Sequence, residues 1–124
     1  MMGFGIGRLR SVGYAVVGIA YLIRSQRNAW VHVLASVLVL GMGWWLRLAV
    51  GEWCWIFAAM GMVWVAEALN TAVEILCDVV CVERHAGIGR VKDVAAGGVL
   101  LAAGFAGVIG MCVLGPHFLR IVAS

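Results

Sequence analysis

A stripe of polar residues interrupts an otherwise apolar stretch in the middle of the chain. It consists of Glu67, Asn70, Thr71, Glu74 and Asp78. In a helix these five positions fall within about 100° of arc, so they share one face. Ionisable groups are rare in apolar segments unless they serve a function, which favours a site over a chance grouping. Carboxylates in such a setting can accept a proton or bind a divalent cation.

The depth of the stripe separates two kinds of function. If the helix enters a membrane at Trp53, a rise of about 1.5 Å per residue puts Glu67 about 21 Å down and Glu74 about 31 Å down. A transporter is expected to hold its key acid near the midplane, whereas a headgroup enzyme needs acids at the interface. The stripe favours the enzyme, with a small Glu67-dependent transporter as one alternative. A second alternative is that Glu74 and Asp78 form a solvated helix end and that Glu67 pairs with an arginine from the N-terminal segment.

A second polar cluster follows in segment 83–93, where two glycines lie between charged residues. Its members include Arg84, His85, Arg90, Lys92 and Asp93. Phosphate groups recruit such cations, and an acid beside them can hold a metal or a substrate hydroxyl. A basic loop alone needs only the positive-inside rule to explain it. Beside an acid-lined helix, it predicts cations for phosphate next to carboxylates for Mg²⁺.

The composition places both clusters in or beside a membrane. Of the 124 residues, 65% are hydrophobic and 12% are charged, with a mean hydropathy of +1.06. A soluble domain has about 45 to 50% apolar and about 25% charged residues, and a disordered chain has even fewer apolar ones. The net charge is +3, and the nine basic residues are scattered along the chain rather than gathered on one face. This distribution excludes a nucleic-acid partner. The four cysteines form no CxxC pair, so we expect no disulfide framework.

The elements that position the clusters follow from hydropathy. Three stretches are long enough to cross a membrane as helices, namely residues 30–50, 53–82 and 94–114. The preceding segment 3–27, with arginines around a short apolar run, is typical of a helix on the membrane surface. We therefore expect one all-α membrane domain over residues 1–124, in which this surface helix precedes a bundle of three transmembrane helices. Most basic residues lie on the side of the N-terminus and the 83–93 loop, which predicts that this side is cytoplasmic.

Both clusters match the pattern of one family. The run Glu67-x-x-Asn-Thr-Ala-Val-Glu74-x-x-x-Asp78, followed by His85 and Gly89-Arg-Val-Lys92-Asp93-Val-Ala-Ala96, resembles the signature of the prokaryotic diacylglycerol kinase and undecaprenol kinase family. The similarity also takes in Gly13-Tyr-Ala-Val-Val-Gly18 and Gln26-Arg-Asn-Ala-Trp-Val-His32, so it covers nearly the whole chain.

The resemblance implies a lipid kinase that uses ATP and Mg²⁺. The γ-phosphate would pass to the hydroxyl of a lipid alcohol, converting diacylglycerol to phosphatidic acid or undecaprenol to undecaprenyl phosphate. The resemblance also implies a homotrimer in the bacterial inner membrane, with active sites between neighbouring subunits. The chain has no G-x-x-x-x-G-K-[ST] motif, so a P-loop mechanism is excluded.

The resemblance further implies roles for single residues. Glu67 matches the general base, and Asn70 matches a residue that orients the site against the lipid hydroxyl. Asp93 matches a residue at the boundary between lipid and nucleotide. Glu74 matches a metal ligand. The residues that would bind the Mg-nucleotide are Glu74, Asp78, His85, Arg90, Lys92 and Asp93.

Gln26 departs from the family pattern. It stands where the family usually has a Glu that holds metal together with the counterpart of Glu74. Gln keeps a carbonyl acceptor but lacks the charge, while Mg²⁺ usually takes one or two carboxylates beside phosphates and waters. Glu74 would then suffice with weaker metal affinity. The alternatives are that Glu83 takes part, or that the chain is a catalytically reduced relative that acts as a membrane assembly protein.

Three other residues could form a site for a different metal. Cys77, Cys81 and His85 are spaced four apart, and their side chains are ligands that suit zinc. Only three ligands are evident and they span a helix end, so packing of both thiols against apolar neighbours is favoured. His32 and His117 are interpreted as interfacial or surface residues with no role in metal binding.

Overall fold

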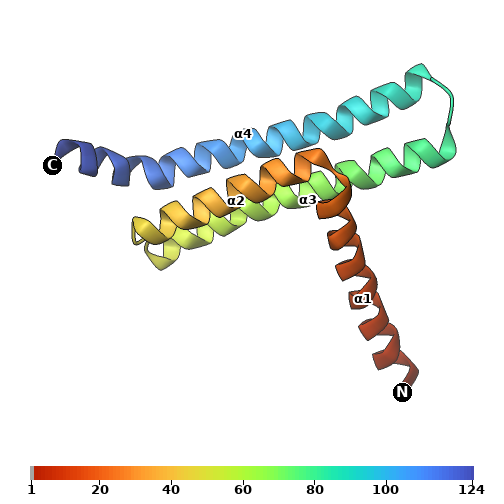
Figure 1. The fold of residues 1–124 in the computed structure, drawn as a ribbon, viewed down its shortest axis with the longest axis horizontal. Helices are drawn as coiled ribbons and strands as arrows, with labels where there is room; N and C mark the ends of the chain where they lie inside the picture. Colours follow the sequence, from red (N-terminus) through yellow and green to blue (C-terminus); the bar gives the residue numbers. More distant parts are fainter. Residues whose placement is uncertain (1) are drawn as a thin grey trace.

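A computed structural model describes residues 2–124, with side chains from Gly5 onward, and this part of the chain is helical without strands (Figure 1). The helices are α1 (Met2–Ser25), α2 (Arg27–Trp45), α3 (Val50–Val80) and α4 (Ala86–Ala123). Figure 1 shows α2, α3 and α4 running along a common axis, while α1 leaves this bundle steeply. α3 packs against both α2 and α4, most extensively against α4. The stripe-bearing helix is therefore central.

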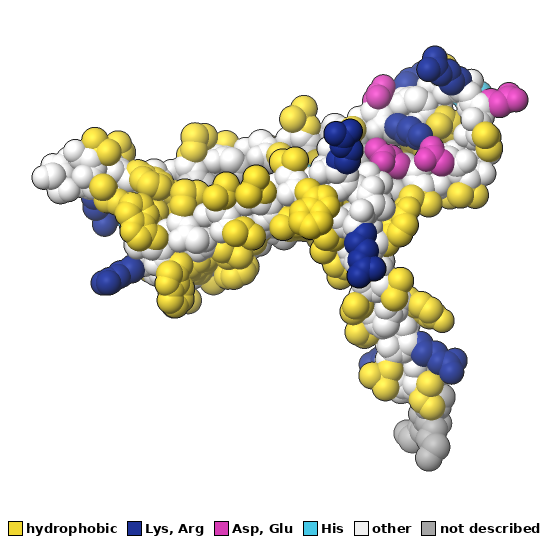
Figure 2. Space-filling model, in the orientation of Figure 1, with side chains coloured by type: hydrophobic (Ala, Val, Ile, Leu, Met, Phe, Trp, Pro, Cys, Tyr) yellow, Lys and Arg dark blue, Asp and Glu magenta, His cyan; other side chains and the backbone are white. Residues whose placement is uncertain are grey.

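The surface of the bundle is apolar. Large hydrophobic side chains are exposed on every helix, and Figure 2 shows them along both the bundle and α1. All four helices are long and apolar enough to cross a membrane, with mean hydropathy from 1.3 for the first two to 2.2 for α4. Such a surface is stable in contact with lipid or with other apolar chains. The prediction of an all-α, multi-pass membrane protein is confirmed.

The first helix is more apolar than its short hydrophobic run indicates. Residues Gly5–Ser25 reach a mean hydropathy of 1.3, the same as α2, so by length and composition this helix too could cross a membrane. Its direction bears on its placement, however. Because α1 leaves the common axis of α2, α3 and α4 steeply (Figure 1), it does not run parallel to those helices. If the common axis follows the membrane normal, α1 lies closer to the membrane plane, as a surface helix does.

The connection between α3 and α4 is shorter than the predicted loop 83–93. α3 ends at Val80 and α4 begins at Ala86, so the loop assignment is wrong beyond His85. His85 is the N-cap of α4, and its Nδ1 accepts a hydrogen bond of 3.0 Å from the backbone N–H of Gly87. This bond satisfies one of the N–H groups that a helix start leaves without a partner. The glycines of the predicted loop therefore lie in the first turns of a helix.

The turn between α2 and α3 is fixed by backbone hydrogen bonds. Arg47 adopts a positive φ of 56°, the left-handed conformation that glycine usually supplies after a helix. The N–H of Arg47 donates to the carbonyl of Trp44, and the N–H of Leu48 donates to the carbonyl of Gly43. These two backbone hydrogen bonds together form a Schellman motif. It reverses the chain within a few residues and sets α3 antiparallel to α2.

The end of the bundle beside this turn contains a small hydrophobic core and a polar contact between α3 and α4. Leu48, Ile56 and Leu114 form the core. Glu52 accepts a hydrogen bond from the backbone N–H of Ala49 at 2.8 Å, and its other oxygen lies 2.8 Å from Nε2 of His117. α4 therefore extends past residue 114, the predicted end of the third span, and contacts the start of α3. The polar stripe lies toward the opposite end of α3.

Candidate functional site

Burial along the stripe falls from its first residue to its last. Glu67, Asn70 and Thr71 are only 2%, 6% and 4% exposed. Glu74 is half-buried and Asp78 is exposed. The helical spacing thus puts the first three residues into the bundle and the last one into solvent. A buried carboxylate is costly unless it is hydrogen-bonded or paired, so the partner of Glu67 defines the local chemistry.

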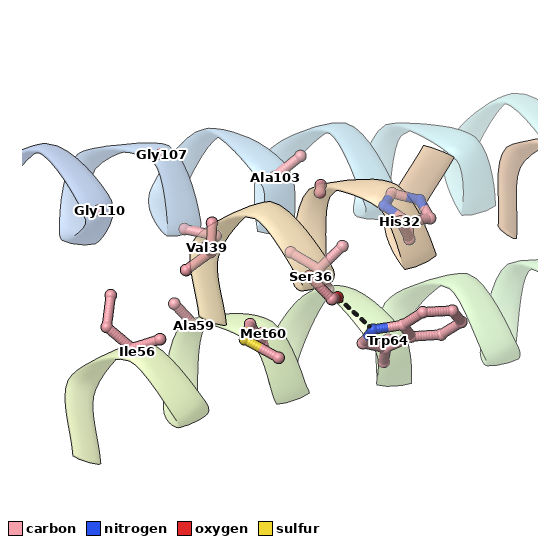
Figure 3. A pocket seen from close by; sticks show the side chains of 13 residues that line it. His32, Ser36, Val39, Ile56, Ala59, Met60, Trp64, Ala103, Gly107 and Gly110 are labelled. Carbon is pink, nitrogen blue, oxygen red and sulfur yellow. Dashed lines mark hydrogen bonds between the residues drawn. The ribbon is translucent and has the colours of Figure 1, made fainter. Parts of the chain in front are cut away.

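The partner of Glu67 is His32 on α2. Nε2 of His32 lies 3.3 Å from Oε2 of Glu67. The His32 ring also meets the ring of Trp64 edge to face, with 6.0 Å between the ring centroids. Trp64 in turn donates from Nε1 to the hydroxyl of Ser36 at 3.0 Å. α2 and α3 are therefore joined by two polar contacts, of which the bond from Trp64 to Ser36 is drawn in Figure 3. Among the described residues, the observed partner of Glu67 is His32 rather than an arginine of the N-terminal segment.

Two buried polar atoms of the stripe have no partner among the described residues. They are Oδ1 of Asn70 and Oγ1 of Thr71. A buried polar atom without a hydrogen bond costs about 1 to 3 kcal/mol, so folded proteins retain few of them. Such atoms are expected to gain a partner from a ligand, a water molecule or another chain. Both lie within one turn of Glu67, which marks this part of α3 as a binding surface.

The second predicted cluster surrounds the α3–α4 connection. Nζ of Lys92 lies 2.6 Å from Oδ1 of Asp78, so the end of α3 is ion-paired with the start of α4. A pocket of about 450 Å³ opens here, and Asp78, His85 and Lys92 line it together with Arg84. Figure 2 shows acidic and basic side chains gathered at this end of the molecule. Three of the residues expected at the nucleotide thus share one cavity.

Arg90 and Asp93 lie outside that cavity. Both side chains are exposed on the first turns of α4, and neither lines the pocket. Their neighbours Gly89 and Lys92 do line it, because residues three apart share a helix face. A single chain therefore does not bring all of the predicted nucleotide residues to one surface.

The residues expected to hold metal come from two places. Glu74 is half-buried on α3, and Gln26 is half-buried at the junction of α1 and α2. The carbonyl of Gln26 accepts a hydrogen bond from the N–H of Ala29, and its side chain forms no cap bond. No group of three or more His, Cys, Asp or Glu within residues 2–124 could hold a metal ion. This set still fits Mg²⁺, which binds nucleotide phosphates and waters with only one or two carboxylates.

Cys77, Cys81 and His85 do not come together as a metal-binding group in the part of the chain that the structure describes. The thiol of Cys81 donates to the carbonyl of Glu83 at 3.1 Å, and Nδ1 of His85 is occupied by the N–H of Gly87. Cys77 is buried among the helices. Packing of the thiol into the bundle thus fits Cys77, whereas Cys81 is half-buried, lines the α3–α4 pocket and hydrogen-bonds a carbonyl.

Sequence reasoning missed His32 as a site residue. It was interpreted as interfacial, yet it is only 15% exposed in its side chain and contacts the buried acid. A signal was present in the spacing. His32 and Ser36 are four residues apart, so they form a polar face on a helix that is otherwise apolar there. That face indicates a polar partner on a neighbouring helix.

Comparison with known proteins identifies the family of this chain. Residues 13–114 match the family described as prokaryotic diacylglycerol kinase. Over 107 residues the chain is 34% identical to the undecaprenol kinase of Bacillus subtilis (strain 168), which covers 86% of this chain and 87% of that protein. Over 115 residues it is 33% identical to the diacylglycerol kinase of Synechocystis sp., covering 92% of this chain and 66% of that protein. The matched region contains both polar clusters, all of α3 and most of α4. The chain therefore belongs to the prokaryotic diacylglycerol kinase family.

Proposed function

We propose that this protein is a lipid kinase that transfers the γ-phosphate of ATP to the hydroxyl of a membrane lipid alcohol. The observation that carries the proposal is the buried carboxylate of Glu67, hydrogen-bonded to His32 and followed on its helix by the unpartnered Oδ1 of Asn70. Family membership supports the kinase chemistry. The named relatives act on undecaprenol and on diacylglycerol, and their near-equal identities favour neither acceptor.

Glu67 is the proposed general base. The lipid oxygen forms a bond to the γ-phosphorus while its hydroxyl proton passes to the Glu67 carboxylate. The bond from the γ-phosphorus to the bridging oxygen breaks, and ADP leaves. His32 donates from Nε2 to Oε2 of Glu67, which orients Oε1 to accept the proton. Proton transfer to a positioned base contributes about 10²- to 10⁴-fold in rate.

The nucleotide is proposed to bind at the α3–α4 connection. The ammonium group of Lys92, held by Asp78 in the free chain, is a suitable partner for the ATP phosphates. His85 and Arg90 supply further donors beside it. Asp93 is proposed to lie where lipid and nucleotide meet, and Asn70 to orient the reacting groups. Charge neutralisation and alignment provide most of the catalysis in phosphoryl transfer.

Mg²⁺ is the proposed cofactor, and Glu74 is the carboxylate that would hold it, with Gln26 as a weaker ligand. The bound ion would neutralise charge on the phosphates. Within the described residues of one chain, no three or more His, Cys, Asp or Glu side chains come together as a metal site. This supports a site completed by phosphate oxygens and by a neighbouring copy in a homotrimer. We propose the bacterial inner membrane as its location, with the N-terminus and the α3–α4 connection on the cytoplasmic side.

The test is Mg-ATP-dependent phosphate transfer in mixed micelles that contain diacylglycerol and undecaprenol side by side. Glu67→Gln is the matched control, because it keeps the size of the side chain and removes the base. Transfer to either lipid that the control loses supports the proposal and identifies the acceptor. Binding of Mg-ATP by a folded protein without transfer to either lipid would contradict it and favour the catalytically reduced relative.

A further inference from the structure

Glu52 is the acidic residue at the end of the bundle opposite the α3–α4 connection. The other acidic residues of the chain all lie between positions 67 and 93, in the stripe or around that connection. Two arginines accompany Glu52, namely Arg47 in the α2–α3 turn and Arg120 near the end of α4. Figure 2 shows basic side chains at this end of the molecule. One carboxylate therefore balances several cations here.

This carboxylate joins the α2–α3 turn, the start of α3 and the end of α4. Its Oε2 accepts a hydrogen bond of 2.8 Å from the backbone N–H of Ala49, and its Oε1 lies 2.8 Å from Nε2 of His117. The side chains of His117 and Glu52 are 17% and 35% exposed, so the contact is partly shielded from water. It lies beside the small hydrophobic core, because Ile56 follows Glu52 by one turn and Leu114 precedes His117 by one turn.

The segment of α4 that this contact holds follows a missing backbone hydrogen bond. Pro116 has no N–H group, so α4 lacks one hydrogen bond of its ladder immediately before His117. The next residue, Phe118, packs against Trp45 of α2 with 6.3 Å between the ring centroids. Without the bond to Glu52, residues 117–123 would be held to the other helices by apolar packing.

We propose that the Glu52–His117 contact is a pH-dependent latch, which holds the end of α4 to the start of α3 more firmly when the imidazole is protonated. The proposal goes beyond the lipid kinase function and does not depend on it. Histidine changes charge at about pH 6.5, whereas glutamate stays ionised down to about pH 4.3. Between these values the contact joins opposite charges, and a charge-assisted hydrogen bond is about twice as strong as a neutral one.

On the basic side of this range the contact weakens without breaking. A neutral imidazole still donates from Nε2 to the carboxylate, but the attraction between opposite charges is gone. The latch therefore adds stability that is present at mildly acidic pH and is lost as the pH rises.

The other titratable side chains at this end keep their charge over the same range. They are Arg47, Cys54, Cys112 and Arg120. The charge of Arg120 also acts on Glu52, but a guanidinium stays protonated throughout. The two thiols change little below about pH 8. A pH-dependent change at this end between about pH 5 and pH 8 is thus expected to come from His117.

Thermal unfolding of four proteins tests the latch, each as the full chain in detergent. They are the unmodified chain, His117→Gln, Glu52→Gln and the double variant. His117→Gln keeps an N–H donor but cannot be protonated, and His32 and His85 are present in all four proteins. The Tm of the unmodified chain minus that of His117→Gln should be about 2 to 5 °C larger at pH 5.5 than at pH 8. In the Glu52→Gln background this pH dependence should disappear.

Hydrogen exchange measures the latch locally and without unfolding the protein. At pH 5.5 the amides of residues 117–123 should exchange several-fold more slowly in the unmodified chain than in His117→Gln, and at pH 8 the two rates should be nearly equal. A ratio of exchange rates that is the same at both pH values would overturn the proposal, whatever the Tm shows. So would a pH-dependent ratio that persists in full in the Glu52→Gln background, because the charge partner of His117 would then be another group.

Discussion

Nε2 of His32 lies 3.3 Å from Oε2 of Glu67, and this contact joins α2 to the one carboxylate that is buried among the described residues. A buried charge is costly unless a hydrogen bond compensates for it. The imidazole therefore stabilises the carboxylate and also fixes its direction. The rate of proton transfer depends on the orientation of the base. The packing of α2 on α3 should therefore affect the proposed reaction, because it determines where His32 lies relative to Glu67.

Replacing His32 should slow transfer without preventing folding. In His32→Ala, Glu67 loses its orienting donor, so kcat for phosphate transfer should fall about tenfold, less than for loss of the base itself. His32→Gln retains an N–H donor and should recover part of the rate. The measurement is kcat with saturating ATP and lipid. A kcat for His32→Ala equal to that of the unmodified chain would show that the contact has no part in the reaction.

Lys92 should act on ATP more than on lipid. Lys92→Met removes the cation at the α3–α4 connection, so the KM for ATP should rise about tenfold, while the KM for lipid changes little. Lys92→Arg keeps the charge and serves as the control. The side chains of Lys92 and Asp78 are 39% and 70% exposed, so water and salt screen their ion pair and its loss should leave the stability of the protein nearly unchanged. Equal rises in both KM values would argue against a nucleotide role.

Gln26 offers a gain-of-function test of the metal site. Gln26→Glu places a carboxylate at this position, so the Mg²⁺ concentration for half-maximal transfer should fall several-fold, because Mg²⁺ favours anionic oxygen ligands. Gln26→Ala should raise the Mg²⁺ concentration for half-maximal transfer or leave it unchanged. A Mg²⁺ titration of transfer at fixed ATP measures both. An unaltered half-maximal concentration in Gln26→Glu would place residue 26 outside the metal site.

Gly43 should tolerate no side chain. It is buried in α2, and an added Cβ would come within 2.7 Å of the indole ring of Trp53. Overpacking of this kind costs about 1 to 3 kcal/mol, so Gly43→Ala should lower the Tm in detergent. Gly41→Ala is the control, because a Cβ there meets nothing within 4 Å, and alanine favours the helix. The contrary result is a Tm for Gly43→Ala at or above that of Gly41→Ala.

The stripe on α3 was predictable because it depends on one helix alone. Helical periodicity puts Glu67, Asn70 and Thr71 on one face, and the structure buries all three. The partner of Glu67 was not predictable in this way. It depends on how α2 is rotated against α3, which is decided by many apolar contacts, including the close approach of Gly43 to Trp53. In the sequence, only the four-residue spacing of His32 and Ser36 indicates that α2 has a polar face toward a neighbouring helix.

The start of α4 was mispredicted for a local reason. Gly87 and Gly89 favour turns in the sequence, but the cap formed by His85 lets the helix begin before them. The placement of α1 on the membrane surface stays a prediction, because the composition of this helix suits both a surface helix and a span.

Glu67→Gln tests the central claim most directly when ATP binding and phosphate transfer are measured on the same sample. The account predicts that this variant binds Mg-ATP with unchanged affinity, because Glu67 lies away from the α3–α4 connection, while kcat falls at least about 100-fold. Transfer by Glu67→Gln within about threefold of the unmodified chain would contradict the assignment of Glu67 as the general base.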